Sequence, residues 1–241
     1  MKLLVANANT TQGITDLCAA AARAAAAAGT EIIPATPRFG PAVIATRVEN
    51  AIAGHALLEL LAQHAGQVDG VLLAVSHDTA LEACRQMMPC PVIGMTEAAA
   101  LVAMTQGARF GLLTFGAVDS YRELLTRHGV IGRVSGLVGL DATPQQVLAE
   151  PARVAAMVQG AIAGMVAEGA ESIILGGAAM AGMGASLTAP VPLLDGIACG
   201  VKLLEALVAL RLAKPGAGSH AAPRGRESVG LDAALAALLR G

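Results

Sequence analysis

The chain has 241 residues, 55% of them hydrophobic, and a formal net charge of −2. A chain of this length can bury a large core, either as one domain or as two lobes. A net charge close to zero gives no electrostatic reason to bind nucleic acid or an anionic membrane surface, so a small-molecule partner is the better expectation.

The first residues predict a strand that runs into a polar loop. The apolar run Lys2–Ala6 is too short for a signal peptide, and Asn7, Asn9, Thr10 and Thr11 interrupt it at once. Elsewhere glycine, proline or charged residues break the apolar stretches before they reach the roughly 20 residues that a bilayer helix needs. We therefore expect a cytoplasmic protein without a membrane or nucleic-acid partner.

Short apolar runs then alternate with longer Ala- and Leu-rich stretches, which is the pattern of a parallel sheet covered by helices. Buried parallel strands are continuously apolar, and eight segments fit that description. The predicted strands are Lys2–Ala6, Glu31–Pro34, Gly70–Val75, Pro91–Met95, Arg109–Thr114, Arg133–Leu140, Glu171–Gly176 and Pro192–Asp195.

The two halves of the chain resemble each other. VDGVLLAVSHDTAL, which contains Val75, matches AESIILGGAAMAGM, which contains Gly177, at an offset of 102 residues. The PVIG that begins at Pro91 matches the PLLD that begins at Pro192, at an offset of 101 residues. A nearly constant offset indicates an internal duplication. We predict an α/β fold of two pseudo-symmetric, flavodoxin-like lobes, each a small parallel sheet flanked by helices, with an active-site cleft between the carboxyl ends of the strands.

The predicted lobes span residues 1–98 and 99–212, and a helix over 200–212 is able to pack back on the first lobe. Residues 213–241 form the predicted tail. Lys214–Gly230 is rich in Pro, Gly, Ser and charge, as flexible linkers are. Leu231–Leu239 predicts a short amphipathic helix, docked on its own subunit or on a neighbour, and a loosely held tail is the favoured interpretation. We also expect a homo-oligomer.

The four cysteines form no CxxC and no metal-like spacing with the five histidines, so neither disulfides nor a metal site is predicted. Cys18 and Cys84 lie in helical patterns and Cys90 lies between prolines, where a thiol acts as a small buried group. Cys199 is predicted to lie near a helix N-terminus, which lowers a thiol pKa, although core packing is the favoured interpretation.

Four short motifs carry a family resemblance. They are NANTT at 7–11, FGP at 39–41 followed by Ile44, Thr46 and Arg47, DTAL at 78–81, and LGGAAMAG at 175–182. In this order, and over Lys2 to about Leu212, the sequence resembles the hydantoin/allantoin branch of the aspartate/glutamate/hydantoin racemase superfamily.

The resemblance implies an enzyme that works without a cofactor on a small carboxylate or a hydantoin-like imide. In that family two thiols, one from each lobe, face the two sides of an acidic C–H, and backbone amides hold the substrate and the developing enolate. Here the two thiol positions correspond to Val75 and Gly177, neither of which can carry a proton. A shift of one residue would place Ser76 at the first position.

The loop that follows the third predicted strand holds the candidate catalytic residues. His77 titrates near neutrality and is predicted as a general base or acid. Ser76 is predicted to hold an oxyanion or to act as a nucleophile. Asp78 is a predicted substrate-binding residue; alternatively, Asp78 or Thr79 caps the following helix.

Other residues are predicted to bind substrate, each with an alternative. Asn9 and Thr10 end an apolar strand and either contact the ligand or form Asx-turns. Arg47, like Arg38, either recognises a carboxylate or lies on the surface. Glycines near 177 either admit an anion to the backbone or allow close packing. The remaining predicted substrate-binding residues are Phe39, Val75, Thr114, Gly177 and Ala178.

Three functions are compatible with these residues. Because one base is visible, a lyase, decarboxylase or hydrolase that needs a single base is the leading hypothesis. The alternative is a racemase or isomerase of hydantoin- or amino-acid-type substrates with a base other than cysteine. The third is a homologue that binds a small molecule without turnover.

Overall fold

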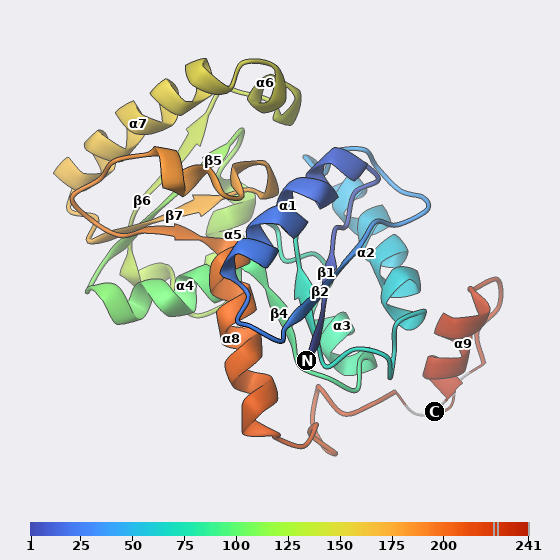
Figure 1. Cartoon of the computed structure of the whole chain (residues 1–241). Helices are drawn as coiled ribbons and strands as arrows, with labels where there is room; N and C mark the ends of the chain where they lie inside the picture. The colour runs from blue at the N-terminus through green and yellow to red at the C-terminus, as the bar shows by residue number, and fades with distance from the viewer. Residues whose placement is uncertain (224, 226, 241) are drawn as a thin grey trace.

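The computed structural model describes residues 1–223, 225 and 227–240, without the side chains of residues 144, 145 and 148. It contains two four-stranded parallel sheets with the same strand order, β2-β1-β3-β4 and β6-β5-β7-β8 (Figure 1). The strands are β1 Lys2–Ala6, β2 Glu31–Ala35, β3 Gly70–Leu73, β4 Val92–Gly94, β5 Phe110–Phe115, β6 Val134–Leu140, β7 Ser172–Gly176 and β8 Leu193–Asp195. All eight predicted strands are confirmed, with ends that move by no more than two residues, and so is the two-lobed α/β fold.

Helices flank both sheets. They are α1 Gln12–Ala25, α2 Arg47–Ala62, α3 Leu81–Met87, α4 Met95–Gln106, α5 Asp119–Arg127, α6 Pro144–Ala149, α7 Pro151–Ala167, α8 Gly196–Leu210 and α9 Ala233–Arg240. Short 3₁₀ turns cover Ile131–Arg133, Ala178–Met180 and Met183–Ser186. Side-chain caps stabilise the N-termini of two of these helices. Helix α2 begins with a capping box between Thr46 and Glu49, and the Asp195 carboxylate caps α8.

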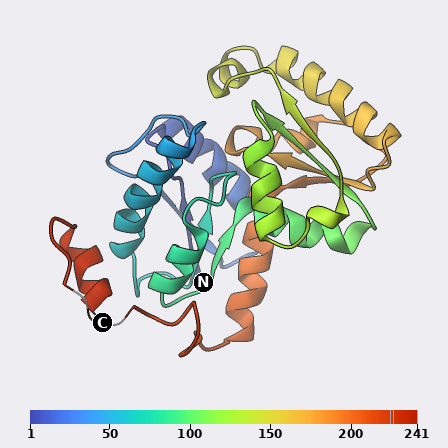
Figure 2. The same cartoon turned by 180° about the vertical axis from the view of Figure 1, so that it is seen from behind.

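The lobes exchange helices. Helix α4 follows β4 of the first sheet but packs on β7 and β8 of the second, whereas α8 follows β8 and packs on β3 and α1 of the first. The two helices also pack against each other, as both cartoon views show in the middle of the molecule (Figures 1 and 2). A Cβ at Gly196 would crowd the backbone of Met95, so glycine at the start of α8 lets the two helix starts approach.

The exchange joins the two cores. One apolar cluster contains Leu72 and Ile93 of the first sheet, Ile173 of the second, and Val201 and Leu204 of α8. A second cluster lies between the first sheet, α2 and α3, and a third lies between α4 and the second sheet. Because one core crosses the lobe boundary, the relative placement of the lobes is fixed by the same packing that stabilises each lobe.

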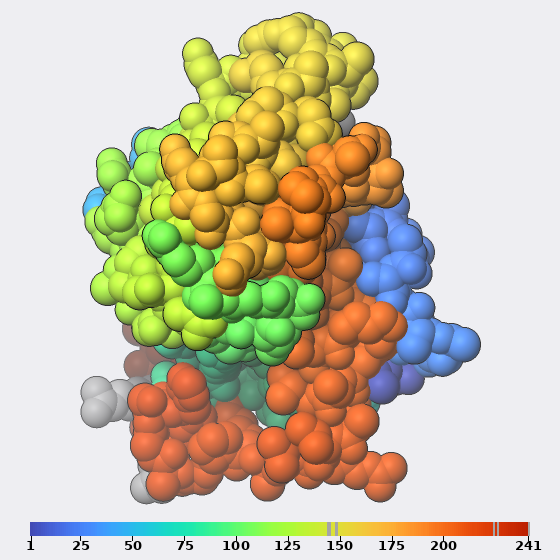
Figure 3. Space-filling model, turned by 90° about the vertical axis from the view of Figure 1, so that its left-hand side faces the viewer, coloured from blue at the N-terminus to red at the C-terminus, as the bar shows by residue number. Residues whose placement is uncertain are grey.

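The C-terminal segment returns to the first lobe. Helix α9 packs on α2 through the buried Leu235, and the Lys214 ammonium donates to the carbonyls of Gln86 (2.5 Å) and Met88 (2.7 Å) at the end of α3. The short helix therefore docks on its own chain, where the sequence favoured a loosely held tail. Of the predicted tail, residues 224, 226 and 241 lie outside the described residues. In Figure 3 the red tail lies at the lower left, beside the lower part of the orange α8.

No helix among residues 1–223 and 227–240 is long and apolar enough to cross a membrane. The cytoplasmic location and the homo-oligomer stay predictions.

Candidate active site between the lobes

A cavity of about 360 Å³ lies where the carboxyl ends of the two sheets face each other. Ligands of open α/β sheets bind at this edge. The cavity is lined by Asn9, Thr11, Ile14, Ala42, Val43, Ile44, Ala45, Ala74, Val75, Ser76, His77, Thr114, Phe115, Gly116, Ala117, Ser120, Tyr121, Ala142, Thr143, Gly177, Ala178 and Ala179. A second hollow, around Lys2 and Asp69, lies at the opposite edge of the first sheet.

Seven predicted site residues line this cavity, and four do not. Inside are Asn9, Val75, Ser76, His77, Thr114, Gly177 and Ala178; outside are Thr10, Phe39, Arg47 and Asp78. The cavity also contains residues that sequence analysis missed, above all Ser120 and Tyr121 at the start of α5. Tyr121 is the single tyrosine of the chain and follows a buried strand closely, which is the signal that could have revealed it.

The loop after β3 is held by the second lobe. His77 Nε2 lies 3.0 Å from Ser120 Oγ, and the His77 and Tyr121 rings are 5.0 Å apart. The Tyr121 hydroxyl donates to Ser76 Oγ at 2.7 Å. Consecutive residues of the loop thus contact consecutive residues of α5, and both side chains face one cavity.

A chain of hydroxyls ends at Ser76. Thr114 Oγ1 donates to the Tyr121 hydroxyl (3.0 Å), which donates to Ser76 Oγ. Because Ser76 Oγ accepts from Tyr121, its own hydrogen is available to a partner in the cavity, and each hydrogen bond in such a chain polarises the next. Burial raises the pKa of Tyr121, so the phenol remains a donor at neutral pH. Ser76 is therefore suited to hold a developing oxyanion.

Burial lowers the pKa of His77, because desolvation disfavours the imidazolium. The ring is therefore neutral at pH 7, the state that a general base requires. The hydrogen bond to Ser120 fixes the ring, and the tautomer decides which of the two donates.

Asn9 forms an Asx-turn and also lines the cavity, and its contact with a ligand stays a prediction. Its side-chain oxygen accepts from the Thr11 backbone N–H (2.9 Å), as in an Asx-turn, and from Asn7 Nδ2 (3.0 Å). The side-chain oxygen of Asn9 is engaged in these contacts, and its amide nitrogen is a further donor group. Thr10 instead uses its backbone N–H to hold Pro41 of the β2–α2 loop (3.0 Å).

The second lobe contributes open backbone. Gly177 has φ +150°, a conformation that residues with a side chain rarely adopt, and a Cβ built there would meet nothing closer than Met180 Cγ at 4.0 Å. Ala178, the next residue, also lines the cavity. This wall therefore offers space and main-chain groups without acid–base chemistry.

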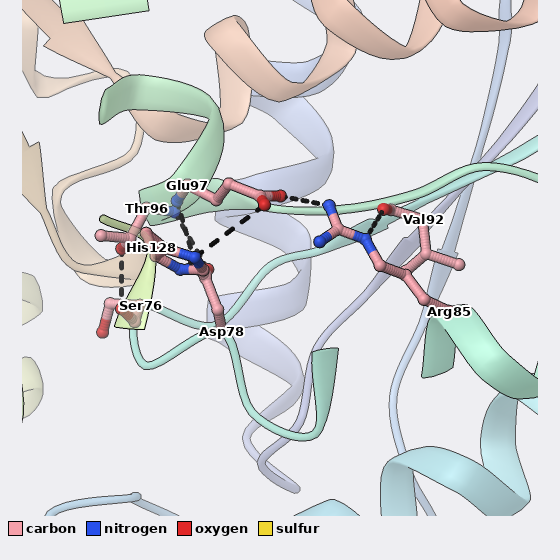
Figure 4. Close-up of polar contacts among 7 residues, drawn as sticks. All are labelled: Ser76, Asp78, Arg85, Val92, Thr96, Glu97 and His128. Carbon is pink, nitrogen blue, oxygen red and sulfur yellow. Dashed lines mark hydrogen bonds and ion pairs between the residues drawn. The ribbon is translucent and has the colours of Figure 1, made fainter. Parts of the chain in front are cut away.

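Asp78 points away from the cavity. Its carboxylate accepts the backbone N–H groups of Thr96 (3.0 Å) and Glu97 (2.8 Å) at the start of α4, and lies 3.2 Å from His128 Nε2 (Figure 4). The alternative prediction is that Asp78 or Thr79 caps the helix that follows, α3. Asp78 does accept N–H groups at a helix start, but the helix is α4. Burial raises the Asp78 pKa against these hydrogen bonds.

Arg47 and Phe39 lie at the surface. The Arg47 guanidinium forms a bidentate ion pair with Glu123 of α5 (2.6 and 3.0 Å), and both side chains are more than half exposed. Phe39 packs edge-on against the His55 ring at 5.5 Å. Arg38 is 3.6 Å from Asp232 in the tail. Neither arginine faces the cavity.

None of the four cysteines lines the cavity. Burial raises the pKa of Cys18 and Cys84 to about 12 and that of Cys90 and Cys199 to about 11. Cys199 packs against the core, as the favoured interpretation predicted, and burial, followed by the Asp195 charge, raises its pKa instead of lowering it. Within the described part of the chain, no three His, Cys, Asp or Glu residues gather as metal ligands.

The site and the fold define a class: a two-lobed α/β protein with a cavity between two sheets of the same strand order. The chain belongs to the Asp/Glu/Hydantoin racemase family, whose model matches residues 3–204. It is 30% identical over 233 residues to a hydantoin racemase of Paenarthrobacter aurescens, covering 92% of this chain and 98% of that protein.

Solved structures agree with this assignment. Allantoin racemase from Klebsiella pneumoniae superposes with a TM-score of 0.92 at 33% identity, covering 98% of both chains. Allantoin racemase from Pseudomonas fluorescens gives a TM-score of 0.91 at 30% identity, covering 95% of this chain and 100% of that chain.

Proposed function

We propose that the protein is a cofactor-independent racemase of a hydantoin-type substrate, in which His77 removes the proton from the acidic carbon and thiols take no part. The observation that carries this proposal is the composition of the cavity wall: it includes His77, Ser76, Thr114 and Tyr121, and none of the residues that line it is Asp, Glu, Lys, Arg or Cys.

The uncharged wall selects the substrate class. A substrate carboxylate in a largely apolar cavity needs a cation or several amides to balance its charge, and the nearest predicted candidate, Arg47, is paired with Glu123 outside. A neutral cyclic imide needs only hydrogen-bond partners, which Asn9, Ser76 and the backbone near Gly177 offer. This argues for a hydantoin-like ring over a dicarboxylate.

The proposed reaction begins with proton transfer. The neutral His77 imidazole takes the proton from the carbon beside the ring carbonyl, the C–H electron pair moves into the enolate, and the carbonyl oxygen becomes an oxyanion that accepts from Ser76. His77 then carries the proton as imidazolium until it exchanges with solvent.

The second half-reaction returns a proton to the opposite face of the planar carbon. Gly177 and Ala178 form the wall without acid–base groups, so the proton comes either from solvent on that side or from His77 after the enolate turns over. Val75 and Gly177, which the resemblance places at the family's thiol positions, both line the cavity and so face the substrate space.

The similarity to hydantoin and allantoin racemases favours racemisation over the single-base lyase or hydrolase that the sequence alone suggested. One observation keeps a decarboxylase as second candidate: His77 is the one imidazole at the cavity wall, and decarboxylation needs a single proton donor. A protein that binds without turnover is the third outcome of the same test.

The test uses single enantiomers of 5-substituted hydantoins and of allantoin, together with aryl-substituted malonates, in deuterated water. Loss of optical rotation with deuterium at the ring carbon supports the proposal. Carbon dioxide release from malonates, with hydantoins untouched, would replace it with the decarboxylase. Thermal stabilisation by a hydantoin without exchange or racemisation would reduce the protein to a binder.

A further inference from the structure

Three consecutive residues of the loop after β3 are each held by a different residue of the second lobe, two in α5 and one, His128, at its C-terminal cap. Ser76 is paired with Tyr121 (2.7 Å), His77 with Ser120 (3.0 Å), and Asp78 with His128 (3.2 Å). The first two pairs face the cavity, and the third lies outside it. Helix α5 belongs to the second lobe, so the loop of the first lobe is aligned along a helix of the other.

Asp78 also ties the loop to α4. Its carboxylate is fully buried and accepts two backbone N–H groups at the helix start, while Thr96 Oγ1 donates to the Ser76 carbonyl (2.7 Å). Helix α4 packs on the second sheet, so this tie crosses the lobes as well. Figure 4 shows Ser76, Asp78, Thr96, Glu97 and His128 gathered around this point.

The position of this carboxylate requires unusual backbone conformations near Asp78 and a residue without a side chain at position 94. Asp78 has φ +45° and Ala80 has φ +54°, left-handed conformations that cost free energy in residues with a side chain. A Cβ at Gly94, the cap position of α4, would overlap the Asp78 carboxylate. Gly94 itself has φ −84° and ψ 148°, which any residue adopts, so glycine is needed there for space alone.

The cluster continues outward. Glu97 contacts Arg85 by an ion pair and lies 3.9 Å from His128 Nδ1, and Arg85 Nε donates to the Val92 carbonyl (2.9 Å). These contacts fix the side chains that surround Asp78, so its carboxylate has one well-defined place.

We propose that Asp78 is a positioning residue: its carboxylate, anchored on α4 and His128, sets the place of Ser76 and His77 in the cavity. It does not touch the substrate. Only the kinetic measurements for this proposal rest on the proposed function. The environment of the His77 ring can be followed by NMR without turnover.

The experiment compares Asp78→Asn and Gly94→Ala with the control Glu123→Gln, which breaks the exposed interlobe pair with Arg47. Asp78→Asn replaces an acceptor oxygen by a donor that faces N–H groups, and Gly94→Ala displaces the carboxylate while every polar group remains. The pKa of His77 is measured by NMR, with the ring signal assigned by its loss in His77→Gln, alongside kcat, KM and thermal stability.

Both test variants should raise the His77 pKa toward its ordinary value, because the released ring is more solvated. They should lower kcat by about 10- to 100-fold with a smaller change in KM, the usual effect of misplacing a catalytic group by about 1 Å. Glu123→Gln should change neither the His77 pKa nor kcat.

A folded Asp78→Asn or Gly94→Ala protein with the wild-type His77 pKa and wild-type kcat overturns the proposal. Should both variants fail to fold, His128→Gln removes one contact of the carboxylate, and an unchanged His77 pKa there overturns it equally. If the wild-type protein turns over no hydantoin, the proposed function fails while the NMR comparison still decides the role of Asp78.

Discussion

The loop after β3 and the loop after β7 occupy equivalent places in two sheets of the same strand order, yet they are built differently. The first carries Ser76 and His77 into the cavity, and the second presents Gly177 and Ala178. The two loops thus form equivalent walls of the cavity, but side chains capable of acid–base chemistry lie only on the wall that the first loop forms.

The two loops are also fastened in opposite ways. In the first lobe the carboxylate belongs to the loop: Asp78 reaches to the start of α4, where Gly94 leaves space. In the second lobe the carboxylate belongs to the helix cap: Asp195 accepts from Ile197 N–H (2.7 Å) and also from Gly182 N–H of the loop (2.5 Å). A loop held by its own side chain fixes its neighbours, whereas a loop held by a backbone N–H can consist of small residues.

The largest expected effect comes from the imidazole on the first wall. His77→Gln should lower turnover by about 10²–10⁴-fold, the usual contribution of a general base. Because burial lowers the His77 pKa, the wild-type rate should fall only as pH drops below the ordinary imidazole range, and the variant should lose that acid limb. Kinetics from pH 4.5 to about 9 check both; a variant with wild-type kcat and pH profile would remove His77 from the mechanism.

A side chain on the second wall should cost stability. Gly177→Cys forces a residue with a Cβ to adopt φ +150°, which should lower the free energy of unfolding by about 1–3 kcal/mol. Val75→Cys, the matched variant in the first lobe, removes only a little buried volume and should cost about 1 kcal/mol. Denaturant unfolding of both variants measures the difference, and equal stabilities would show that the second loop tolerates a side chain freely.

The hydroxyl chain should give a smaller effect on catalysis. Tyr121→Phe removes the donor to Ser76 and the acceptor of Thr114, so oxyanion stabilisation weakens by about one hydrogen bond. Turnover should fall by about 5- to 10-fold, with KM nearly unchanged. The matched variant Tyr121→Leu also removes the ring beside His77, so its turnover should fall further. If Tyr121→Phe keeps the full kcat, the hydrogen bond from Tyr121 to Ser76 makes no contribution to catalysis.

The smallest expected effect is that of thiol alkylation. Iodoacetamide at about pH 7.5 should leave the activity intact, because burial holds the thiol pKa values at about 11 to about 12 and none of the cysteines reaches the cavity. Mass spectrometry counts the modified thiols against residual activity. Inactivation that a hydantoin prevents would return a thiol to the site.

The fold was accessible from sequence because its strands are buried and apolar, and because the 102-residue offset from Val75 to Gly177 exposed the duplication. The site was accessible only in part. Residues at or just after the carboxyl end of a strand, such as Thr114 and His77, could be placed at the cavity. The partners of His77 and Ser76 could not, because Ser120 and Tyr121 lie on the other lobe and their contacts depend on how the lobes dock. The ion pair of Arg47 with Glu123 could not be predicted for the same reason, because it also joins the two lobes.

The exchange of α4 and α8 has a consequence for the origin of the fold. Each sheet is covered in part by a helix from the other half of the chain, the first sheet by α8 and the second by α4. A half-length ancestor would therefore cover its sheet completely only as a domain-swapped pair of identical subunits. Fusion of two such copies removes the dependence of stability on concentration, and it frees the two cavity walls to diverge under separate selection.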